Sequence, residues 1–307
     1  MATTNSAVLS QVMGFALRKP ALENLRAALV FGNKSWAEAG SFQPGADVIK
    51  FATVPDLSIA TTPLTEGSPP TAVALSVTAV NLDSDQYGNL ITITDLAKVK
   101  SPLDLTNLAG ERLGRNAAES IDQLVRDVIA GGGTVMYSEA AATVRTDLDA
   151  TGDEVTAAVL RKLAAKMFKA KIPRFPDNFY RIIVSPEVGY DISSETGAGS
   201  MIDVKKYTDP SDTIQGEIGA MGGFRIIQAV NAPTFASTVT VHASIAFGRL
   251  PGWGWGDLDS LKTYYTPPGG KGDELHQKES VGWKVAFGTA VLANARYYRL
   301  ESAATAL

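Results

Sequence analysis

Residues 104–130 read DLTNLAGERLGRNAAESIDQLVRDVIA, and this stretch carries the strongest helical pattern of the chain. Asp104 and Thr106 supply start signals for a helix, and the three glycines at 131–133 end the pattern. About 25 residues at about 1.5 Å each predict a helix roughly 37 Å long, twice the usual length. The apolar residues that recur near the helical period are Leu105, Leu108, Leu113, Ala117, Ile121, Leu124 and Val128.

Upstream of this helix, residues 46–100 have a β-type pattern. Strands are predicted from Val48, over residues 73–79 where apolar and small polar residues alternate, and over residues 89–94. Residues 60–72 between the first two strands read ATTPLTEGSPPTA, and a paired central strand does not accept three prolines. We therefore predict a long two-stranded excursion with a polar, proline-stiffened tip. Because an isolated hairpin is marginal in water, its apolar face is expected to contact a neighbouring subunit.

Residues 252–257 read GWGWGD, with two tryptophans between glycines. Such indoles could stack on a sugar or a base. We expect instead a tight loop whose indoles bury against a neighbouring subunit, since tryptophan is enriched at interfaces. The residues predicted to contact a neighbour are therefore Thr62, Pro63, Leu64, Glu66, Pro69, Pro70, Trp253 and Trp255.

The rest of the chain alternates shorter helices and strands. Residues 1–45 are predicted as an extended arm with one short helix over Leu22, Leu25, Ala28 and Leu29. The fold class is α+β, with one long helix and an extended β excursion. Downstream we predict a hairpin over 135–147, a helix over 154–169, a strand over 179–184, a helix beginning at Ser185 and Pro186, a loop or flap over 195–223, and strands over 224–230, 239–247 and within 281–300.

Composition excludes several classes of protein. The chain has 307 residues, of which 45% are hydrophobic, so it can bury a core. It has no cysteine, which excludes disulfides, zinc–cysteine clusters and thiol nucleophiles. The net charge is −4, and no net basic stripe of the kind that grips DNA stands out. The first 20 residues lack the pattern of a secretory signal, and no apolar run approaches a membrane span, so a soluble protein is expected.

The catalytic inventory is poor. The phosphate-loop, nucleophile-elbow and zinc-helix motifs are absent, and the glycine-rich run at 216–223 precedes a strand instead of following one. We expect His242 to be a surface or hydrogen-bonded histidine on a strand and His276 to be solvated in a charged loop. The pair Asp83 and Asp85 is more simply a turn than a metal site. No catalytic, cofactor or metal site is predicted, and the chain is not expected to be an enzyme.

An ordered set of segments carries a family resemblance. It comprises residues 59–67, 86–89, 91–95, 182–191, 216–219, 224–227 and 281–287. In this order they resemble the tailed-phage major capsid family typified by the coliphage N-four capsid protein, over residues 46–303. The resemblance implies the Hong Kong 97-type capsid fold and a virion subunit that is made in the host cytoplasm and self-assembles into an icosahedral shell around double-stranded DNA.

The resemblance also implies a division of the chain. Residues 1–45 are expected to form the N-terminal arm and residues 46–100 the extended loop with its adjoining strand. Residues 101–152 are expected to form the peripheral domain with its spine helix, residues 153–258 the axial domain, and residues 259–307 the return to the peripheral domain. The implied partners are copies of the chain in hexamers and pentamers, a portal protein, scaffold or decoration proteins, and non-specifically held DNA, with no membrane and no cofactor.

Two other hypotheses remain open at this stage. A cellular compartment of the encapsulin type would keep the fold but hold protein cargo and lack a portal. A soluble hydrolase, with a site assembled around His242 from residues distant in sequence, would be a monomer or a small oligomer. The long proline-tipped excursion favours a shell protein over the hydrolase.

Overall fold

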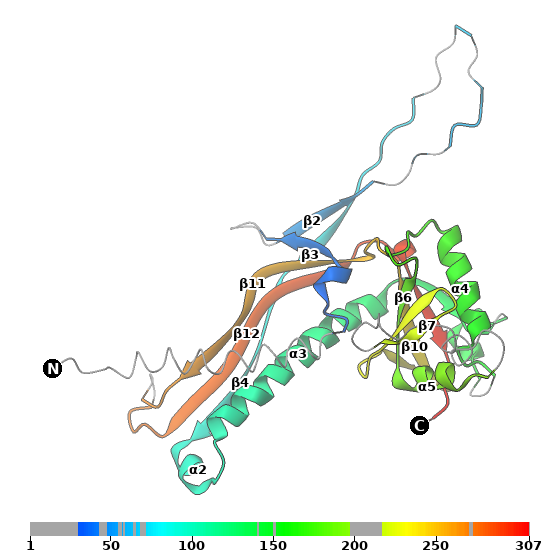
Figure 1. Ribbon diagram of the computed structural model, residues 1–307. Coiled ribbons are helices and arrows are strands. Elements are labelled where there is room, and N and C mark those ends of the chain that lie inside the picture. Colours follow the sequence, from blue (N-terminus) through cyan, green and yellow to red (C-terminus); the bar gives the residue numbers. More distant parts are fainter. Residues whose placement is uncertain are drawn as a thin grey trace.

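The computed structural model describes residues 30–42, 48–54, 57, 59–63, 66–67, 72–139, 141–149, 152–196, 217–269 and 273–306. The short helix predicted over Leu22, Leu25, Ala28 and Leu29 lies outside these residues. The molecule is elongated, with a long helix and long strands running side by side, a body of sheet and shorter helices at one end, and a two-stranded projection that extends away from both (Figure 1).

The elongated part is built on a four-stranded sheet. Its strands are β1 (Glu38–Ser41), β11 (Trp253–Thr266), β12 (Lys278–Val291) and β4 (Asp85–Thr94), in that order. β1 is parallel to β11, and the other two pairs are antiparallel. The strand predicted at 89–94 is therefore confirmed as part of β4. The sheet brings the N-terminal arm, the middle and the C-terminal part of the chain together.

The long helix α3 (Leu105–Gly131) confirms the prediction of a helix over 104–130. Asp104 caps it by accepting hydrogen bonds from the backbone N–H groups of Thr106 and Asn107. Its apolar face packs on β12, where the Trp283 indole donates to the Asn116 side chain (3.2 Å). The buried face is shifted from the predicted stripe, because Val125 and Ile129 are fully buried while Leu108 is exposed.

A second core lies at the other end of the molecule. A seven-stranded sheet has the order β5 (Thr134–Tyr137), β13 (Tyr297–Ser302), β10 (Thr240–Phe247), β6 (Tyr180–Val184), β8 (Phe224–Gln228) and β7 (Glu217–Met221), with β9 (Thr234–Ala236) paired to β10. The helices α4 (Ala157–Lys169) and α5 (Pro186–Ser194) bury their apolar sides against it. Ser185 caps α5 and Pro186 opens it, as predicted.

The projection is the β excursion, which we define as residues 48–83. Its strands β2 (Val48–Thr53) and β3 (Thr78–Asp83) form a two-stranded sheet of their own. The predicted two-stranded excursion is therefore confirmed. The second strand, however, begins at Thr78 and not at residue 73, because Thr78 pairs with Thr53, the last residue of β2. The other short elements are η1 (Lys34–Trp36), α2 (Asp95–Lys100), η2 (Arg145–Asp147) and η4 (Asn294–Arg296).

Two further predictions are corrected. Residues 135–147 are not a hairpin, because β5 pairs in parallel with β13, and Arg145 in η2 reaches the buried carboxylate of Glu301 with two hydrogen bonds (2.8 and 2.7 Å). Part of the predicted loop over 195–223 is a strand, since β7 pairs with β8. The β5–β13 pairing joins distant segments, so local patterns do not encode it, whereas β7 and β8 form a hairpin through Gly222 and Gly223, a local turn signal that the sequence prediction overlooked.

Candidate assembly surfaces

The base of the β excursion lies on a floor of glycines. A Cβ atom added at Gly256 in β11 would lie 2.7 Å from Ile49 Cδ1 and 2.8 Å from Leu82 Cδ2. An added Cβ at Gly40 in β1 would lie 2.9 Å from the Phe51 ring. These atoms are the ends of side chains that can move aside, whereas a Cβ added at Gly288 in β12 would meet the backbone oxygen of Asp83, so glycine is required at Gly288 for the excursion to sit on the sheet. Gly254 and Gly288 line the same floor.

The two tryptophans of the GWGWG segment face the opposite side of β11. Trp253 and Trp255 are 1% and 4% exposed and belong to the chain's own core. Trp255 stacks on Phe287 with ring centroids 4.7 Å apart, and Trp253 meets Phe247 edge-on at 5.2 Å. The prediction that they form a loop and bury against a neighbour is therefore wrong. Alternation along a strand places the indoles in the core and the glycines under the excursion.

Beyond its base, the excursion exposes apolar side chains. Six of them are between 51% and 80% exposed. They are Val54, Leu57, Ile59, Val73, Leu75 and Val77. So many exposed aliphatic groups in one thin projection indicate a surface that binds a partner, because isolated exposed residues are ordinary but a continuous set is not.

The residues predicted at the tip divide into two sets. Thr62, Pro63 and Glu66 are exposed on the described part of the tip, where a neighbour could reach them. Leu64, Pro69 and Pro70 lie outside the described residues. That these residues contact a neighbouring subunit stays a prediction.

A second exposed apolar surface lies at the far end of the elongated part. Leu96 and Val99 on α2 and Leu103 before α3 are 57%, 85% and 63% exposed. A buried carboxylate holds this end in place: Glu279 of β12 accepts hydrogen bonds from Lys98 Nζ (2.8 Å), Thr106 Oγ1 (2.6 Å) and the Tyr265 hydroxyl (2.9 Å). The surface is thus presented by a fixed scaffold.

The same carboxylate is electrostatically tuned. Burial alone raises the pKa of Glu279, but the three hydrogen bonds that it accepts outweigh burial and lower its pKa. For the donor of one of these hydrogen bonds, burial and the bond to Glu279 raise the pKa of Tyr265 to about 12. Glu279 is therefore held as an anion and Tyr265 as a donor.

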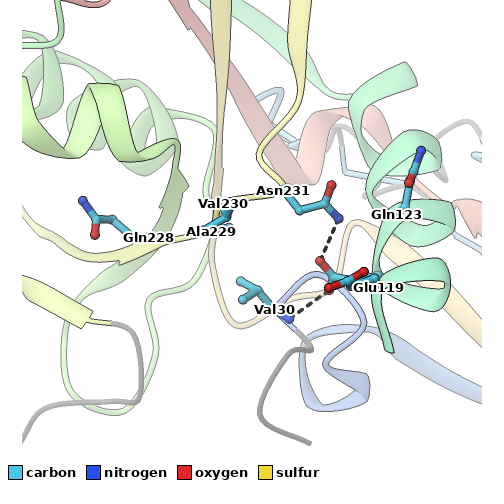
Figure 2. Close-up of a pocket in the computed structure, with 8 residues that line it drawn as sticks. Val30, Glu119, Gln123, Gln228, Ala229, Val230 and Asn231 are labelled. Atoms are coloured by element: carbon cyan, nitrogen blue, oxygen red, sulfur yellow. Dashed lines mark hydrogen bonds between the residues drawn. The ribbon is translucent and has the colours of Figure 1, made fainter. Parts of the chain in front are cut away.

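The N-terminal arm is attached to the long helix through Asp122. This carboxylate is 2% exposed and accepts hydrogen bonds from the backbone N–H groups of Val30 (2.8 Å) and Gly32 (2.9 Å) and from the Asn231 side chain (3.1 Å). Figure 2 shows Val30 and Asn231 converging on it from the arm and from the turn after β8. Sequence reasoning missed this junction, because a single aspartate within a charged helix gives no signal.

A cavity of about 470 Å³ surrounds this junction (Figure 2). Glu119, Gln123 and Val230 line its outer part. The one carboxylate that the described residues bury in it, Asp122, is engaged in the three bonds given above. Asp122 therefore fixes the N-terminal arm in place, and both of its carboxylate oxygens already accept hydrogen bonds.

His242 sits in the only arrangement among the described residues that resembles a catalytic pair. Its Nδ1 lies 2.9 Å from Ser185 Oγ and 3.9 Å from a carboxylate oxygen of Glu187. A serine–histidine–acid triad needs the serine and the acid on different ring nitrogens, whereas both face Nδ1 here. Ser185 also accepts from Val188 N–H as the cap of α5 (3.3 Å). Burial lowers the pKa of His242, so this group is a neutral hydrogen-bonding histidine, within the expectation from sequence.

No group of three or more histidine, aspartate and glutamate side chains among the described residues is arranged to hold a metal ion. None of the helices in the described part of the chain is both long and apolar enough to cross a membrane.

Comparison with known proteins shows which family the chain is similar to. The sequence model of a family described as phage capsid protein matches residues 77–300, which is more than half of the chain. No curated protein matches the chain.

Solved structures add the fold. The capsid of Ralstonia phage GP4 is 12% identical, covers 91% of this chain and 92% of its own, and superposes with a TM-score of 0.72. The capsid of cyanophage P-SCSP1u is 18% identical, with 91% and 89% covered and a TM-score of 0.64. The capsid of Helicobacter pylori bacteriophage KHP30 is 11% identical, with 87% of each chain covered and a TM-score of 0.63. The chain therefore has the Hong Kong 97-type capsid fold.

Proposed function

Because the chain belongs to the phage capsid protein family and is the major capsid protein of a phage shell, we propose that rings of five and six copies close into this shell through the β excursion. Each excursion extends over a neighbouring subunit, and its exposed aliphatic residues bury there. The single observation that carries the proposal is the set of six exposed apolar side chains on a projection with little of its own chain to cover them.

The proposal also assigns the segments of the chain to the domains of a capsid subunit, on the basis of the two hydrophobic cores. Residues 101–152 and 259–307 act as the peripheral domain, whose spine is α3, and residues 153–258 act mainly as the axial domain around the five- and six-fold axes. The proposal assigns residues 1–45 to the arm and residues 46–100 to the extended loop. It is supported by the two hydrophobic clusters, one centred on α3 and the four-stranded sheet and one centred on α4 and α5, while β5 and β13 from the peripheral segments complete the seven-stranded sheet of the second.

Many modest contacts stabilise such a shell together. Each contact between ring members is heterologous, so the ring closes when the rotation between copies is right. Every subunit makes several contacts at once, and the effective concentration within the ring strengthens each of them. A slightly acidic subunit, with a net charge of −4, suits a wall that confines double-stranded DNA.

The biological setting follows the same proposal. The protein resides in the virion, and we propose that it is synthesised in the host cytoplasm and meets a portal protein and scaffold or decoration proteins there. Within the family, the ordered segments from residue 59 to residue 287 support the proposal that the chain is of the N-four type. The family description favours a phage shell over a cellular compartment, and it gives no reason to assign an enzymatic activity.

The test is deletion of residues 60–72. We expect the deletion variant to fold, because the described part of this segment is exposed, and to fail to form stable shells. Particle mass by light scattering and negative-stain microscopy distinguish shells from single subunits. A variant in which a glycine–serine segment of equal length replaces residues 60–72 keeps the six aliphatic residues and the reach of the excursion, so we expect it to form shells, and its failure would assign the contact to the side chains of the tip. Normal shells from the deletion variant would refute the proposal.

A further inference from the structure

The solvent face of α4 concentrates positive charge. Residues 155–176 contain six of the chain's 28 basic residues, whereas all 32 acidic residues lie elsewhere in the sequence. The six are Arg161, Lys162, Lys166, Lys169, Lys171 and Arg174. We call this set the α4 basic face, and it corrects the expectation from the net charge that no basic stripe stands out. Each of its members is exposed, while Leu160, Leu163 and Met167 on the other side of the helix are fully buried.

The face is built for access. The same side of the helix also exposes the small residues Ala158 and Ala165 and the ring of Phe168, which is 69% exposed. In Figure 1, α4 lies on the outside of the body and not between its sheets. Among the ion pairs formed by the described residues, none involves a member of the α4 basic face, although the exposed lysines Lys34, Lys98 and Lys262 are paired. Its charge is therefore available to an external anion.

The helix itself does not require this much charge. Positive residues near a helix C-terminus interact favourably with the helix dipole, which accounts for Lys166 and Lys169 in the last turn. Arg161 and Lys162 lie in the first half of the helix, where the dipole gives no such benefit. Arg174 lies beyond the helix and packs over the Phe168 and Tyr180 rings (5.7 and 5.3 Å).

We propose that the α4 basic face binds the phosphate backbone of duplex DNA without sequence preference and that this face points into the lumen of the shell. The proposal rests on the function given above, in that the shell must enclose DNA. Lys162 to Lys169 spans about 10 Å along the helix. Duplex DNA carries one charge per roughly 1.7 Å of its axis, so several phosphates fall within reach of this row.

The residue types favour DNA over a protein partner. Lysine is depleted in protein–protein interfaces, where a flexible and strongly hydrated ammonium is costly to desolvate. Lysine and arginine both neutralise DNA phosphates in contacts that carry no sequence information. Four of the six residues in the α4 basic face are lysines.

The first test measures DNA binding by the full-length, unassembled subunit. Fluorescence anisotropy with a labelled duplex of random sequence is recorded at several salt concentrations for the wild type and for Lys162→Gln/Lys166→Gln/Lys169→Gln. Each lost phosphate contact makes the slope of log affinity against log salt shallower by about 0.9, so we expect a total change of about 2.7. The matched control, Lys50→Gln/Lys100→Gln/Lys278→Gln, removes the same charge from exposed positions elsewhere and should keep the wild-type slope.

The second test places the face in the shell. The chain has no cysteine, so Lys166→Cys introduces a single thiol. We expect a membrane-impermeant, bulky maleimide to leave this thiol unreacted in intact shells and to modify it once the shells are opened. Modification in intact shells would put the face on the outside and overturn the proposal.

The outcomes separate this proposal from the function on which it rests. Equal salt slopes for both triple variants, or no binding by the wild type, overturn the α4 proposal even if wild-type shells form. An α4 triple variant that keeps the wild-type slope but does not assemble also overturns it, because the face is then a contact between subunits. If wild-type subunits form no shells under any condition, it is the proposed function that fails, whatever the anisotropy shows.

Discussion

The Oδ1 atom of Asp122 lies 2.8 Å from the backbone nitrogen of Val30, and this contact joins the N-terminal arm to the middle of α3. The other carboxylate oxygen accepts from Asn231, whose own side-chain oxygen is held by Arg126. One buried carboxylate thus links the arm, the long helix and the turn that follows β8. The arm and the two cores are therefore positioned by a shared group.

Removing this carboxylate should destabilise the subunit. Asp122→Ala leaves the N–H groups of Val30 and Gly32 without their acceptor, and a buried donor without a partner costs about 1–3 kcal/mol. Asp122→Asn should cost less, because its amide oxygen can still accept from the arm while its NH2 group meets the Asn231 donor. Urea unfolding measures the free energy of unfolding of each variant and so tests whether Asp122→Ala loses more stability than Asp122→Asn. Asp127→Ala is the control, since the Asp127 side chain is 57% exposed, and a loss as large as that of Asp122→Ala would contradict the assignment.

The exposed aliphatic residues of the excursion should matter for assembly and not for folding. In Val73→Ser/Leu75→Ser/Val77→Ser, the subunit loses side chains that are 58–65% exposed, so its unfolding midpoint should stay within the usual range for surface changes. Shells should become much weaker, because each side chain fully buried at a neighbour contributes about 1.5–3 kcal/mol. Light scattering across subunit concentrations measures this.

The matched control for that variant changes aliphatic residues elsewhere. Val144→Ser and Val230→Ser alter side chains that are 51% and 94% exposed outside the excursion. Shells from the control should match the wild type. If the excursion variant assembles at the same concentration as the control, its apolar residues are not the contact.

The glycine floor gives a third prediction. In Gly288→Ala the new Cβ meets the backbone oxygen of Asp83 at the end of β3 and lies 2.7 Å from Leu82 Cδ2, so the backbone at the base of the excursion must shift, and overpacking of this kind costs about 1–3 kcal/mol. Gly131→Ala is the control with the same chemical change, because its added Cβ meets nothing within 4 Å. The two unfolding free energies should differ clearly. Equal values would mean that the excursion is not seated on this floor.

Glu279 predicts a loss of stability in acid. Its pKa is lowered in the folded state below its ordinary value of 4.5, so the carboxylate contributes stability above pH 4.5 and loses it as the pH falls through the folded pKa. Glu279→Gln should lower stability at pH 7 and flatten the decline below pH 4.5. Urea midpoints at pH 7, 4.5 and 3 test this, with the exposed Glu274→Gln as control. A wild-type decline that is unchanged in Glu279→Gln would assign the acid sensitivity to other groups.

Helices whose caps and apolar stripe lie within one short segment could be predicted from the sequence alone. The α3 helix has caps, stops and a helical stripe within its own 27 residues, and α5 has its Ser185–Pro186 start. The pairing of β5 with β13 joins positions more than 150 residues apart, so residues 135–147 alone suggested a hairpin that does not form. The ordered family resemblance, and no single motif, gave the fold and function.

The GWGWG segment shows why part of the site was misread. Glycine favours turns and tryptophan favours interfaces, so single-residue preferences indicate a loop against a neighbour. The signal for a strand was the period of two, which continues as alternating burial to Thr266. The reason for the glycines is the excursion about 200 residues earlier in the chain, and no property of the segment itself reveals it. Asp122 was missed for the same reason, because its partners come from distant segments.

The two-faced strand β11 also limits how this protein can change during evolution. Deleting or inserting one residue before Trp253 would exchange the two faces, placing indoles beneath Ile49 and Leu82 and glycines against the long helix. A single insertion or deletion would therefore disrupt both the packing of the excursion on the sheet and the packing of the core, although the same types of residue would still be present. We therefore expect homologous chains to vary in length in their surface loops but to have no insertion or deletion within this strand, so that its alternation of faces is kept.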